Sequence, residues 1–370
     1  MAILVHVEAT RRAADGDPAS ALDLLVDFTY FARQMADREF HAEMAWGLHH
    51  IISTLERLRD VAYVDSRDDE ALESDAIHEV IERLSSDRRA YLGLDRLTFP
   101  RADMLGARQV IEMTYERNGG ARPQIFSSTL SQLTTSDLPL RLFSEHAKWR
   151  DAAVIQMPWN GVNERVARIE GDWRVRWDLD PYDPVNQQPF AYREINPIER
   201  ARCAAVFESV EDMSDLFELR MLANVEAVGT RHALGAIGYH IETSRFAPQI
   251  QSIRPAWIAE IEADPFNADR ERGRKPPLFY FVPIRDTADR FPSAQQVGPH
   301  QLNIIMADGP NIRVLLRDDT FVMYSVGPDS AKNWADEVQN SATAPSGRDY
   351  LIWPPVMSLQ RTNLVQDGQL

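Results

Sequence analysis

The amino-acid sequence predicts an α+β protein in which an N-terminal antiparallel α-helical array precedes a long helix packed on a small antiparallel sheet. Apolar residues recur every three or four positions through residues 1–120, which is the period of amphipathic helices. Runs rich in β-branched and aromatic residues, separated by turn residues, concentrate after residue 275. We therefore expect a helical array over 1–120, a mixed connecting region over 121–215, and an α+β domain over 216–370.

The helical array contains one distinct helix-start signal, the turn residues 15–17 followed by Pro18. Proline is favoured in the first turn of a helix, and Leu22, Leu25 and Phe28 then follow on one helical face. Short connections between successive amphipathic helices favour antiparallel neighbours. The helices are expected within residues 15–37, 38–64, 68–86 and 99–120, after an apolar helix-like stretch that opens the chain.

The first residues of the chain are apolar and helix-like, with no capping residue before them. We therefore expect the native chain to carry a further apolar segment upstream, within a longer precursor or as an anchor. Within the printed sequence, no run of about 18 apolar residues is present to span a bilayer, and no signal-peptide pattern is visible.

The connecting region combines a strand-like pattern with a linker-like one. Trp173, Val175 and Trp177 alternate after the turn residues 170–172, which predicts a hairpin. The two tryptophans are then either half-buried sheet residues, which is the commoner role, or the lining of a ligand groove. Four prolines without a helical period predict a Pro-rich extended linker, after which helix resumes near Pro197.

The last region opens with a long helix over 216–246, whose small residues permit close packing against a sheet. Two β-rich runs follow, joined by Asp318 and Asp319, which predicts a hairpin. The second run, Phe321–Val326, is largely apolar on both faces and is expected to be an inner strand covered by the long helix. Gly327–Ser330 then fits a β-turn with proline at its second position. The small residues of the helix are Ala223, Ala227, Gly235 and Gly238.

The composition excludes several classes of partner and site. The formal net charge is −16 and the sequence pI is about 5.0, so the surface repels nucleic acid and anionic membranes. The single cysteine, Cys203, forms no internal disulfide and supplies no cysteine-rich zinc site; we expect it to be a small core residue. No phosphate-binding glycine loop, dinucleotide fingerprint or nucleophile elbow is present in the sequence.

Acidic and histidine residues near the start of the second predicted helix raise the question of a metal site. Glu39 and Glu43 are four positions apart, whereas His41 and His49 are eight apart, about two helical turns. Two metal ligands on one helix need closer spacing, so other segments would have to complete a site. Surface or helix-contact histidines are therefore the preferred interpretation.

Three short segments follow the long helix in a fixed order: 264–266 (Asp-Pro-Phe), Ser325–Asp329 and Asp349–Trp353. In this order they resemble the globular domain of type II secretion major pseudopilins. Together with the N-terminal stretch DGDPASALDLLVDFTYFARQM, they make the chain similar to uncharacterised, membrane-anchored proteins of planctomycete-type bacteria. Those proteins join an N-terminal helical region to a pseudopilin-like C-terminal module.

The resemblance implies a pseudopilin-like C-terminal domain and an extracytoplasmic location, with a membrane anchor upstream. It also implies Ca²⁺ binding, because major pseudopilins hold this ion in the matching loop through oxygen ligands. The alternative is a solvated polar loop in which Asp329 caps its own turn. The ligands that the resemblance implies are Asp329, Asn333, Asp336 and Asp349.

The paired helical and α+β regions, without a catalytic signature, predict a non-catalytic extracytoplasmic structural or protein-interaction protein in a cell-envelope assembly. Its expected partner is another protein or a larger assembly, not nucleic acid. A membrane is reached only through a segment absent from this chain. The alternative is a carboxylate- or metal-dependent hydrolase, which needs Asp, Glu or His residues from different segments to converge in one deep pocket.

Overall fold

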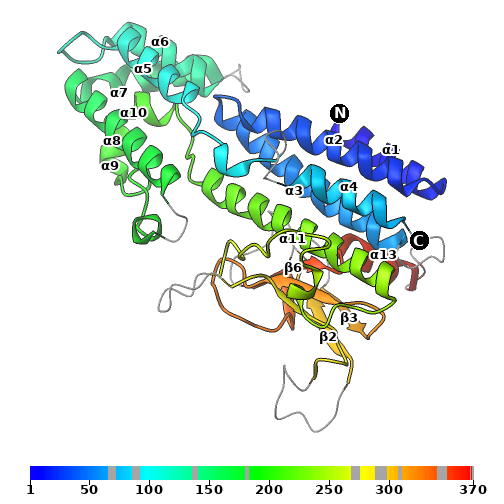
Figure 1. Cartoon of the computed structure of the whole chain (residues 1–370). Helices are drawn as coiled ribbons and strands as arrows, with labels where there is room; N and C mark the ends of the chain where they lie inside the picture. The colour runs from blue at the N-terminus through cyan, green and yellow to red at the C-terminus, as the bar shows by residue number, and fades with distance from the viewer. Residues whose placement is uncertain are drawn as a thin grey trace. The chain divides into compact units, whose positions relative to one another are not determined.

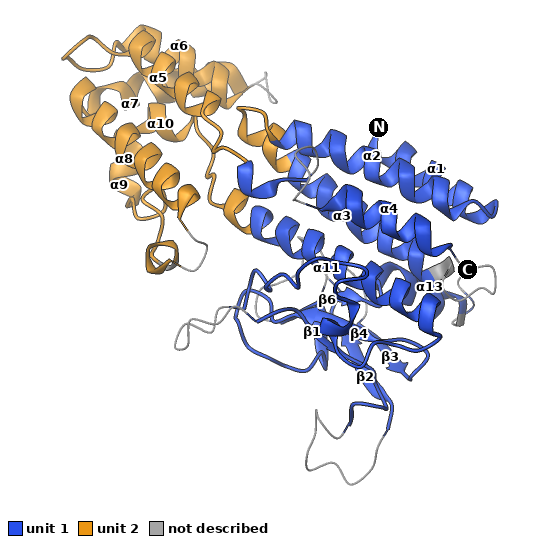
Figure 2. Ribbon diagram, in the orientation of Figure 1, with its two compact units in different colours: residues 1–36, 46–96, 219–370 blue, residues 37–45, 97–218 orange. Residues whose placement is uncertain are grey.

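A computed structural model describes residues 1–65, 72–85, 92–135, 141–179, 183–267, 276–287, 298–306, 311–339, 348–366 and 368. These residues form helices and a six-stranded sheet, so the predicted α+β class is confirmed (Figure 1). They divide into two compact units (Figure 2): unit 1 contains 1–36, 46–96 and 219–370, and unit 2 contains 37–45 and 97–218. The units are not consecutive along the chain, because α3 (His41–Asp65) and α11 (Asp215–Thr243) each contribute to both.

Unit 1 contains N-terminal helices that the apolar periodicity predicts. At the start of α2 the Asp17 carboxylate accepts the backbone N–H of Ser20 at 3.1 Å, as expected of a capping residue. The predicted face of α2 is buried, with Leu22 and Leu25 at 0% exposure and Phe28 at 4%. Within the described ranges, no helix combines the length and the apolar content needed to cross a bilayer. Besides most of α3 and α11, unit 1 has α1 (Ala2–Ala14), α2 (Pro18–Ala36), α4 (Ser74–Leu84), α13 (Val356–Gln366) and the 3₁₀ turns η1 (Leu94–Arg96) and η5 (Ile250–Ile253).

The sheet lies in unit 1 and has the strand order β1-β4-β6-β5-β2-β3. β4 pairs antiparallel with β1 and β6, whereas β5 pairs parallel with β2 and β6. The prediction of an antiparallel sheet is therefore wrong, because β5 enters between two strands that run in its own direction, a pairing that no local turn encodes. The strands are β1 (Phe279–Phe281), β2 (His300–Ile304), β3 (Ile312–Leu316), β4 (Val322–Ser325), β5 (Glu337–Gln339) and β6 (Asp349–Trp353).

The hairpin predicted at Asp318 and Asp319 is also wrong. β3 pairs with β2, and β4 pairs with β1 and β6, so the two runs are strands but not neighbours. The Asp318 carboxylate accepts the backbone N–H groups of Ile284 at 2.7 Å and Arg285 at 3.2 Å. These hydrogen bonds hold the segment between β3 and β4 against the backbone at Ile284 and Arg285. The segment does not form the tight turn that would pair β3 with β4.

The run Phe321–Val326 contains β4, which is an inner strand as predicted, and each residue of the run is at most 2% exposed. Tyr324 and its cross-strand partner Leu351 belong to a core cluster that also includes side chains of β2, β3 and β5. On the other face, a Cβ built on Gly229 of α11 would lie 2.7 Å from Cδ1 of Ile352. This close approach shows that α11 packs directly on the sheet, which Figure 1 also shows.

Unit 2 is mainly helical, and the hairpin predicted after residues 170–172 is wrong. α8 (Trp159–Asp178) runs through that turn. Trp173 and Trp177 lie on its buried face at 0% and 3% exposure, while Val175 is 58% exposed. Trp173 and Trp177 are four positions apart, a spacing that fits one face of a strand and also one face of a helix. The helical period of the apolar residues through the rest of α8 favours the helix.

The Pro-rich segment after α8 is held against that helix. Arg176 donates hydrogen bonds to three backbone carbonyls of the segment, at 2.5, 2.8 and 2.9 Å. α9 starts at Pro197, where the sequence predicts helix to resume, and Asn196 caps it. Cys203 is buried, as expected of a small core residue. The other elements of unit 2 are α5 (Ala102–Thr114), α6 (Pro123–Thr134), α7 (Leu142–Ala152), η3 (Ala153–Ile155), η4 (Pro184–Gln187), α9 (Pro197–Arg202) and α10 (Ala204–Phe207).

Candidate functional site

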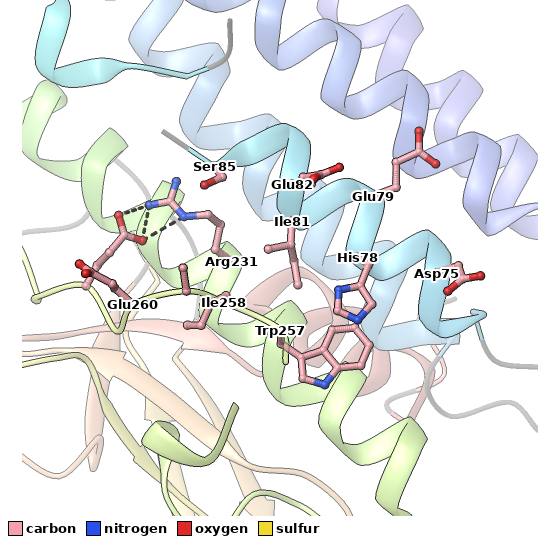
Figure 3. A pocket seen from close by; sticks show the side chains of 12 residues that line it. Asp75, His78, Glu79, Ile81, Glu82, Ser85, Arg231, Trp257, Ile258 and Glu260 are labelled. Atoms are coloured by element: carbon pink, nitrogen blue, oxygen red, sulfur yellow. Dashed lines mark hydrogen bonds and ion pairs between the residues drawn. The ribbon is translucent and has the colours of Figure 1, made fainter. Parts of the chain in front are cut away.

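Unit 1 contains a cavity of about 890 Å³, which we call the α4 groove (Figure 3). It lies between α4, the segment 257–262 and Arg231 of α11. Its volume falls within the range of ligand pockets, roughly 300–1,000 Å³. The lining residues are Asp75, His78, Glu79, Ile81, Glu82, Ser85, Arg231, Trp257, Ile258, Ala259, Glu260 and Glu262.

α4 forms one wall of the groove because its sequence divides into an apolar and an acidic face. Ile77 and Leu84 are 0% and 1% exposed and pack into unit 1. Asp75, Glu79 and Glu82 are exposed. The helical spacing thus leaves a row of carboxylates along the groove.

An aromatic pair forms a second part of the wall. The imidazole of His78 stacks on the indole of Trp257, with ring centroids 3.9 Å apart and planes 7° apart. Trp257 is 3% exposed and fits against α11 at Gly238, where a Cβ would lie 2.3 Å from Cζ3 of the indole. The indole N–H has no hydrogen-bond partner among the described residues. The pair gives the groove a flat aromatic surface that is backed by α11.

Among the described residues that line the groove, Arg231 is the only arginine or lysine, and it is already paired. Its Nε donates to Glu262 at 3.0 Å, and its Nη2 contacts both oxygens of the same carboxylate. Its Nη1 donates to the carbonyl of Leu84 at 2.7 Å, at the C-terminal end of α4. The guanidinium is therefore stabilised by the Glu262 carboxylate and also by the partial negative charge at the C-terminus of α4.

The described residues that line the groove carry more negative than positive charge. Glu262 matches Arg231, and four further carboxylates line the same volume: Asp75, Glu79, Glu82 and Glu260. Figure 3 shows these carboxylates spread around the rim, not pointing at one centre. Among the residues that the structure describes, no group of three or more His, Cys, Asp or Glu side chains is arranged to hold a metal ion. The arrangement suits attraction of a cation more than acid–base chemistry at one atom.

A buried histidine fixes the wall that α11 supports. His232 is 0% exposed, and burial lowers its pKa to about 3, so its imidazole is neutral. Its Nε2 accepts the backbone N–H of Glu262 at 3.3 Å. This hydrogen bond holds the segment 257–262 on α11 without adding charge to the groove.

The residues implied for Ca²⁺ surround one loop of unit 1. Asp349 is 0% exposed; it accepts the backbone N–H of Ala335 at 2.7 Å and that of Asn333 at 3.2 and 3.3 Å. Burial raises the pKa of Asp349 to about 6, and the charges of Asp329 and Asp336 act in the same direction. Asp329 and Asp336 therefore lie close enough to Asp349 to repel its charge, while the oxygens of Asp349 already accept hydrogen bonds from backbone N–H groups.

Asp329 has the turn-capping contact that the sequence offered as an alternative. Its Oδ1 accepts the backbone N–H of Ala331 at 3.0 Å. In the same unit, Asp264 accepts hydrogen bonds from Oγ of Ser325 at 2.7 Å and from the N–H of Val326 at 3.2 Å. Segments that carry the pseudopilin resemblance thus meet in space, and Ca²⁺ binding stays a prediction.

His41 and the acidic residues beside it in sequence are not assembled into a metal centre within the described part of the chain. In unit 2, His41 lies between the carboxylates of Glu211 and Asp215, each 3.1 Å from a ring nitrogen. The hydrogen bond to Asp215 raises the pKa of His41. In unit 1, His50 packs against Trp46 with ring centroids 4.1 Å apart. These are the contacts of helix-packing histidines.

Trp173 and Trp177 are core residues of unit 2. The indole N–H of Trp177 donates to the carbonyl of Leu97 at 2.7 Å. The indole of Trp173 stacks on Tyr192 with centroids 5.4 Å apart. They line neither a sheet face nor the α4 groove.

Sequence reasoning missed the α4 groove because its walls are distant in the chain. Leu84 and Arg231, which bond at one end of the groove, are 147 positions apart. The acidic face of α4 is visible in the sequence SDAIHEVIERL. No local pattern, however, shows that Trp257 packs against that helix.

Comparison of the chain with protein-family models, with curated proteins and with solved structures gives no match.

Proposed function

We propose that this chain is a non-catalytic protein-interaction protein, and that the α4 groove binds a basic segment of a protein partner. The single observation that carries the proposal is the charge of the groove. Among the described residues, the carboxylates of Asp75, Glu79 and Glu260 line it in addition to the Glu262–Arg231 pair, around a volume of about 890 Å³. A concave site with one sign of charge attracts ligands of the opposite sign and raises their association rate.

The volume of the groove favours a peptide segment over a single ion. A site of several hundred Å³ accommodates a ligand of several residues' side chains. The carboxylates stand apart around the rim, so each can meet a different basic side chain of an extended segment (Figure 3). An acidic groove also agrees with the net charge of −16, which disfavours nucleic acid and anionic membranes as partners.

The alternative function is a carboxylate- or metal-dependent hydrolase. The α4 groove does collect Asp, Glu and His residues from different segments, which that chemistry requires. Two observations disfavour it. His78 is stacked on Trp257, and the carboxylates of Asp75, Glu79 and Glu260 diverge from one another. A general acid and base have to reach one reacting atom.

An extracytoplasmic location in a cell-envelope assembly, together with a pseudopilin-like C-terminal arrangement, belongs to the same proposal. Its support is the resemblance carried by the segments around Asp264, Ser325 and Asp349. Fractionation of native cells tests the location. Recovery of the full-length native protein in the cytoplasm would contradict it.

Binding of a fluorescently labelled basic peptide to the whole chain, measured by anisotropy, tests the groove. The double variant Glu79→Gln/Glu260→Gln removes two rim charges, each worth up to about 1 kcal/mol, so we expect about fivefold to thirtyfold weaker binding. Glu112→Gln/Glu164→Gln makes the same change in net charge at exposed sites on unit 2 and is the matched control. We expect the control to bind like the parent chain.

Two outcomes would overturn the proposal. One is the absence of measurable peptide binding at low ionic strength, where attraction between surface charges is strongest. The other is an equal loss in the groove variant and the control variant, which would assign binding to overall acidity. A turnover of ester or peptide substrates that Glu79→Gln abolishes would support the hydrolase instead.

A further inference from the structure

We propose that the α4 groove selects arginine, so that the basic segment of the partner carries an arginine whose guanidinium stacks on His78. This inference rests on the proposed function and deepens it. It names the side chain that the groove recognises and the residue that makes the distinction from lysine.

Arg231 shows that the walls of the groove already bind a guanidinium. Its Nε and Nη2 meet the Glu262 carboxylate as a fork, and its Nη1 reaches the carbonyl of Leu84 at 2.7 Å. The planar fork of arginine satisfies a carboxylate and a carbonyl together, which the compact ammonium of lysine does less well. Further carboxylates of the same kind line the remaining groove.

The stacked pair supplies the surface that distinguishes the two basic side chains. Trp257 covers one face of the imidazole of His78 at 3.9 Å with nearly parallel rings. His78 is only partly buried and lines the groove, and we place the guanidinium on the face of its ring that Trp257 does not cover. A guanidinium stacks flat on an aromatic ring, whereas an ammonium has no flat face to offer.

An acidic residue of α4 is placed to hold such a cation at the ring. Asp75 precedes His78 by three positions, so it lies on the same side of the helix as the imidazole. The ring sets the plane of the guanidinium, and the Asp75 carboxylate accepts its N–H groups.

Three labelled peptides of equal length test the selection: one with a central arginine, one with lysine and one with citrulline, which keeps the shape and removes the charge. All three are titrated into the whole chain by anisotropy. We expect the arginine peptide to bind about threefold to fivefold more tightly than the lysine peptide, the effect of one partly exposed cation–aromatic contact. The citrulline peptide should bind weakest.

Variants at His78 assign the preference to the ring. His78→Leu keeps the indole of Trp257 covered by a side chain without a flat ring, so it should bring the ratio of arginine to lysine affinity to about one while leaving binding of the lysine peptide. His78→Phe keeps a flat ring over Trp257 and should retain the preference. A thermal melt of each variant shows whether it is folded, and the phenylalanine variant keeps the test valid if the leucine variant is not.

The possible results separate the two proposals. If no peptide binds, the basic-segment function itself fails. If both basic peptides bind equally and His78→Leu changes nothing, the groove still binds a basic segment but does not select arginine. Free arginine that competes as well as the peptide would replace a protein partner with a small guanidinium ligand and overturn the peptide assignment.

Discussion

A buried ion pair in unit 1 allows the contribution of helix–sheet contacts to stability to be measured. Arg59 of α3 and Glu226 of α11 form a salt bridge in which both side chains are 1% exposed. The hydroxyl of Tyr350, on β6, donates to the other oxygen of Glu226. Burial and the neighbouring carboxylate raise the pKa of Tyr350 well above its ordinary value, so it remains a protonated donor. One carboxylate thus joins two helices and the sheet.

The expected cost of Glu226→Gln follows from this burial. Glutamine keeps the shape of the side chain and removes its charge, so the Arg59 guanidinium loses its salt-bridge partner and keeps only Glu56 as a neighbouring carboxylate, in a site that water does not reach. Removing one partner of a buried pair typically costs about 3–5 kcal/mol. Whole domains have unfolding free energies of about 5–15 kcal/mol, so the loss is a large fraction of the total. Tyr350→Phe removes one hydrogen bond to a charged group and should cost about 1.5–3 kcal/mol.

Urea unfolding, followed by circular dichroism and by tryptophan fluorescence, measures these free energies. The double variant Arg59→Met/Glu226→Met removes both charges and should be less destabilised than the sum of the two single variants, since neither charge is then left unpaired. Glu8→Gln on the exposed pair with Arg11 is the control and should leave the unfolding midpoint unchanged. A cost below about 1 kcal/mol for Glu226→Gln, as for a surface pair, would refute the reasoning.

Three further predictions concern titratable groups. The pKa of Asp349 is raised from 3.8 to about 6 in the folded state, so between these two pH values the folded state binds a proton that the unfolded state has released. The free energy of unfolding should therefore fall by about 3 kcal/mol as pH rises between these values, and Asp349→Asn should lack this slope. Ca²⁺ that binds only the folded chain should add about 2.7 kcal/mol to the free energy of unfolding at a hundredfold excess over Kd, and Asp329→Ala should remove this increase. A melting temperature that changes with neither Ca²⁺ nor chelator would leave Asp329 as a turn residue. The raised pKa of His41 implies stability that is fully present below pH 6.5 and is lost as pH rises through the folded-state pKa, and Asp215→Asn should diminish that loss in a pH series of urea titrations.

The helices were predictable where one local pattern sufficed. The turn before Pro18, the apolar face of α2 and the restart at Pro197 all depend on residues a few positions apart, and the structure has them as expected. The inner strand β4 was predictable from the run Phe321–Val326 for the same reason, since apolar residues on both faces need cover on both faces. These features are local in sequence and local in space.

The errors fall where two local patterns compete or where pairing is long-range. Trp173 and Trp177 fit a strand and a helix equally well over five residues, and only the longer apolar period through α8 separates the two. Asp318 and Asp319 favour a tight turn, but a contact of Asp318 with the backbone at Ile284 prevails. Strand order and the parallel pairing of β5 depend on such distant contacts, which composition does not encode.

Gly238 is another residue whose distant contact the sequence does not reveal, and this contact supports the α4 groove. In the sequence it is a small residue that permits packing against a sheet, yet in the structure its neighbour is the indole of Trp257. Gly238→Ala places a Cβ 2.3 Å from Cζ3 and 2.4 Å from Cη2 of a ring that is stacked on His78. The ring has to leave its position, so the variant should lose both stability and the preference for arginine peptides.

Gly171→Ala, within α8, is the matched control for that substitution. A Cβ at Gly171 meets no atom within 4 Å among the described residues, so alanine there should only gain helix propensity, about 1 kcal/mol. Thermal melts and peptide titrations of the two variants separate the contact from the propensity. A Gly238→Ala chain that is as stable as the Gly171→Ala chain and keeps its arginine preference would mean that α11 does not hold the aromatic pair. The flat surface of the groove would then need another support.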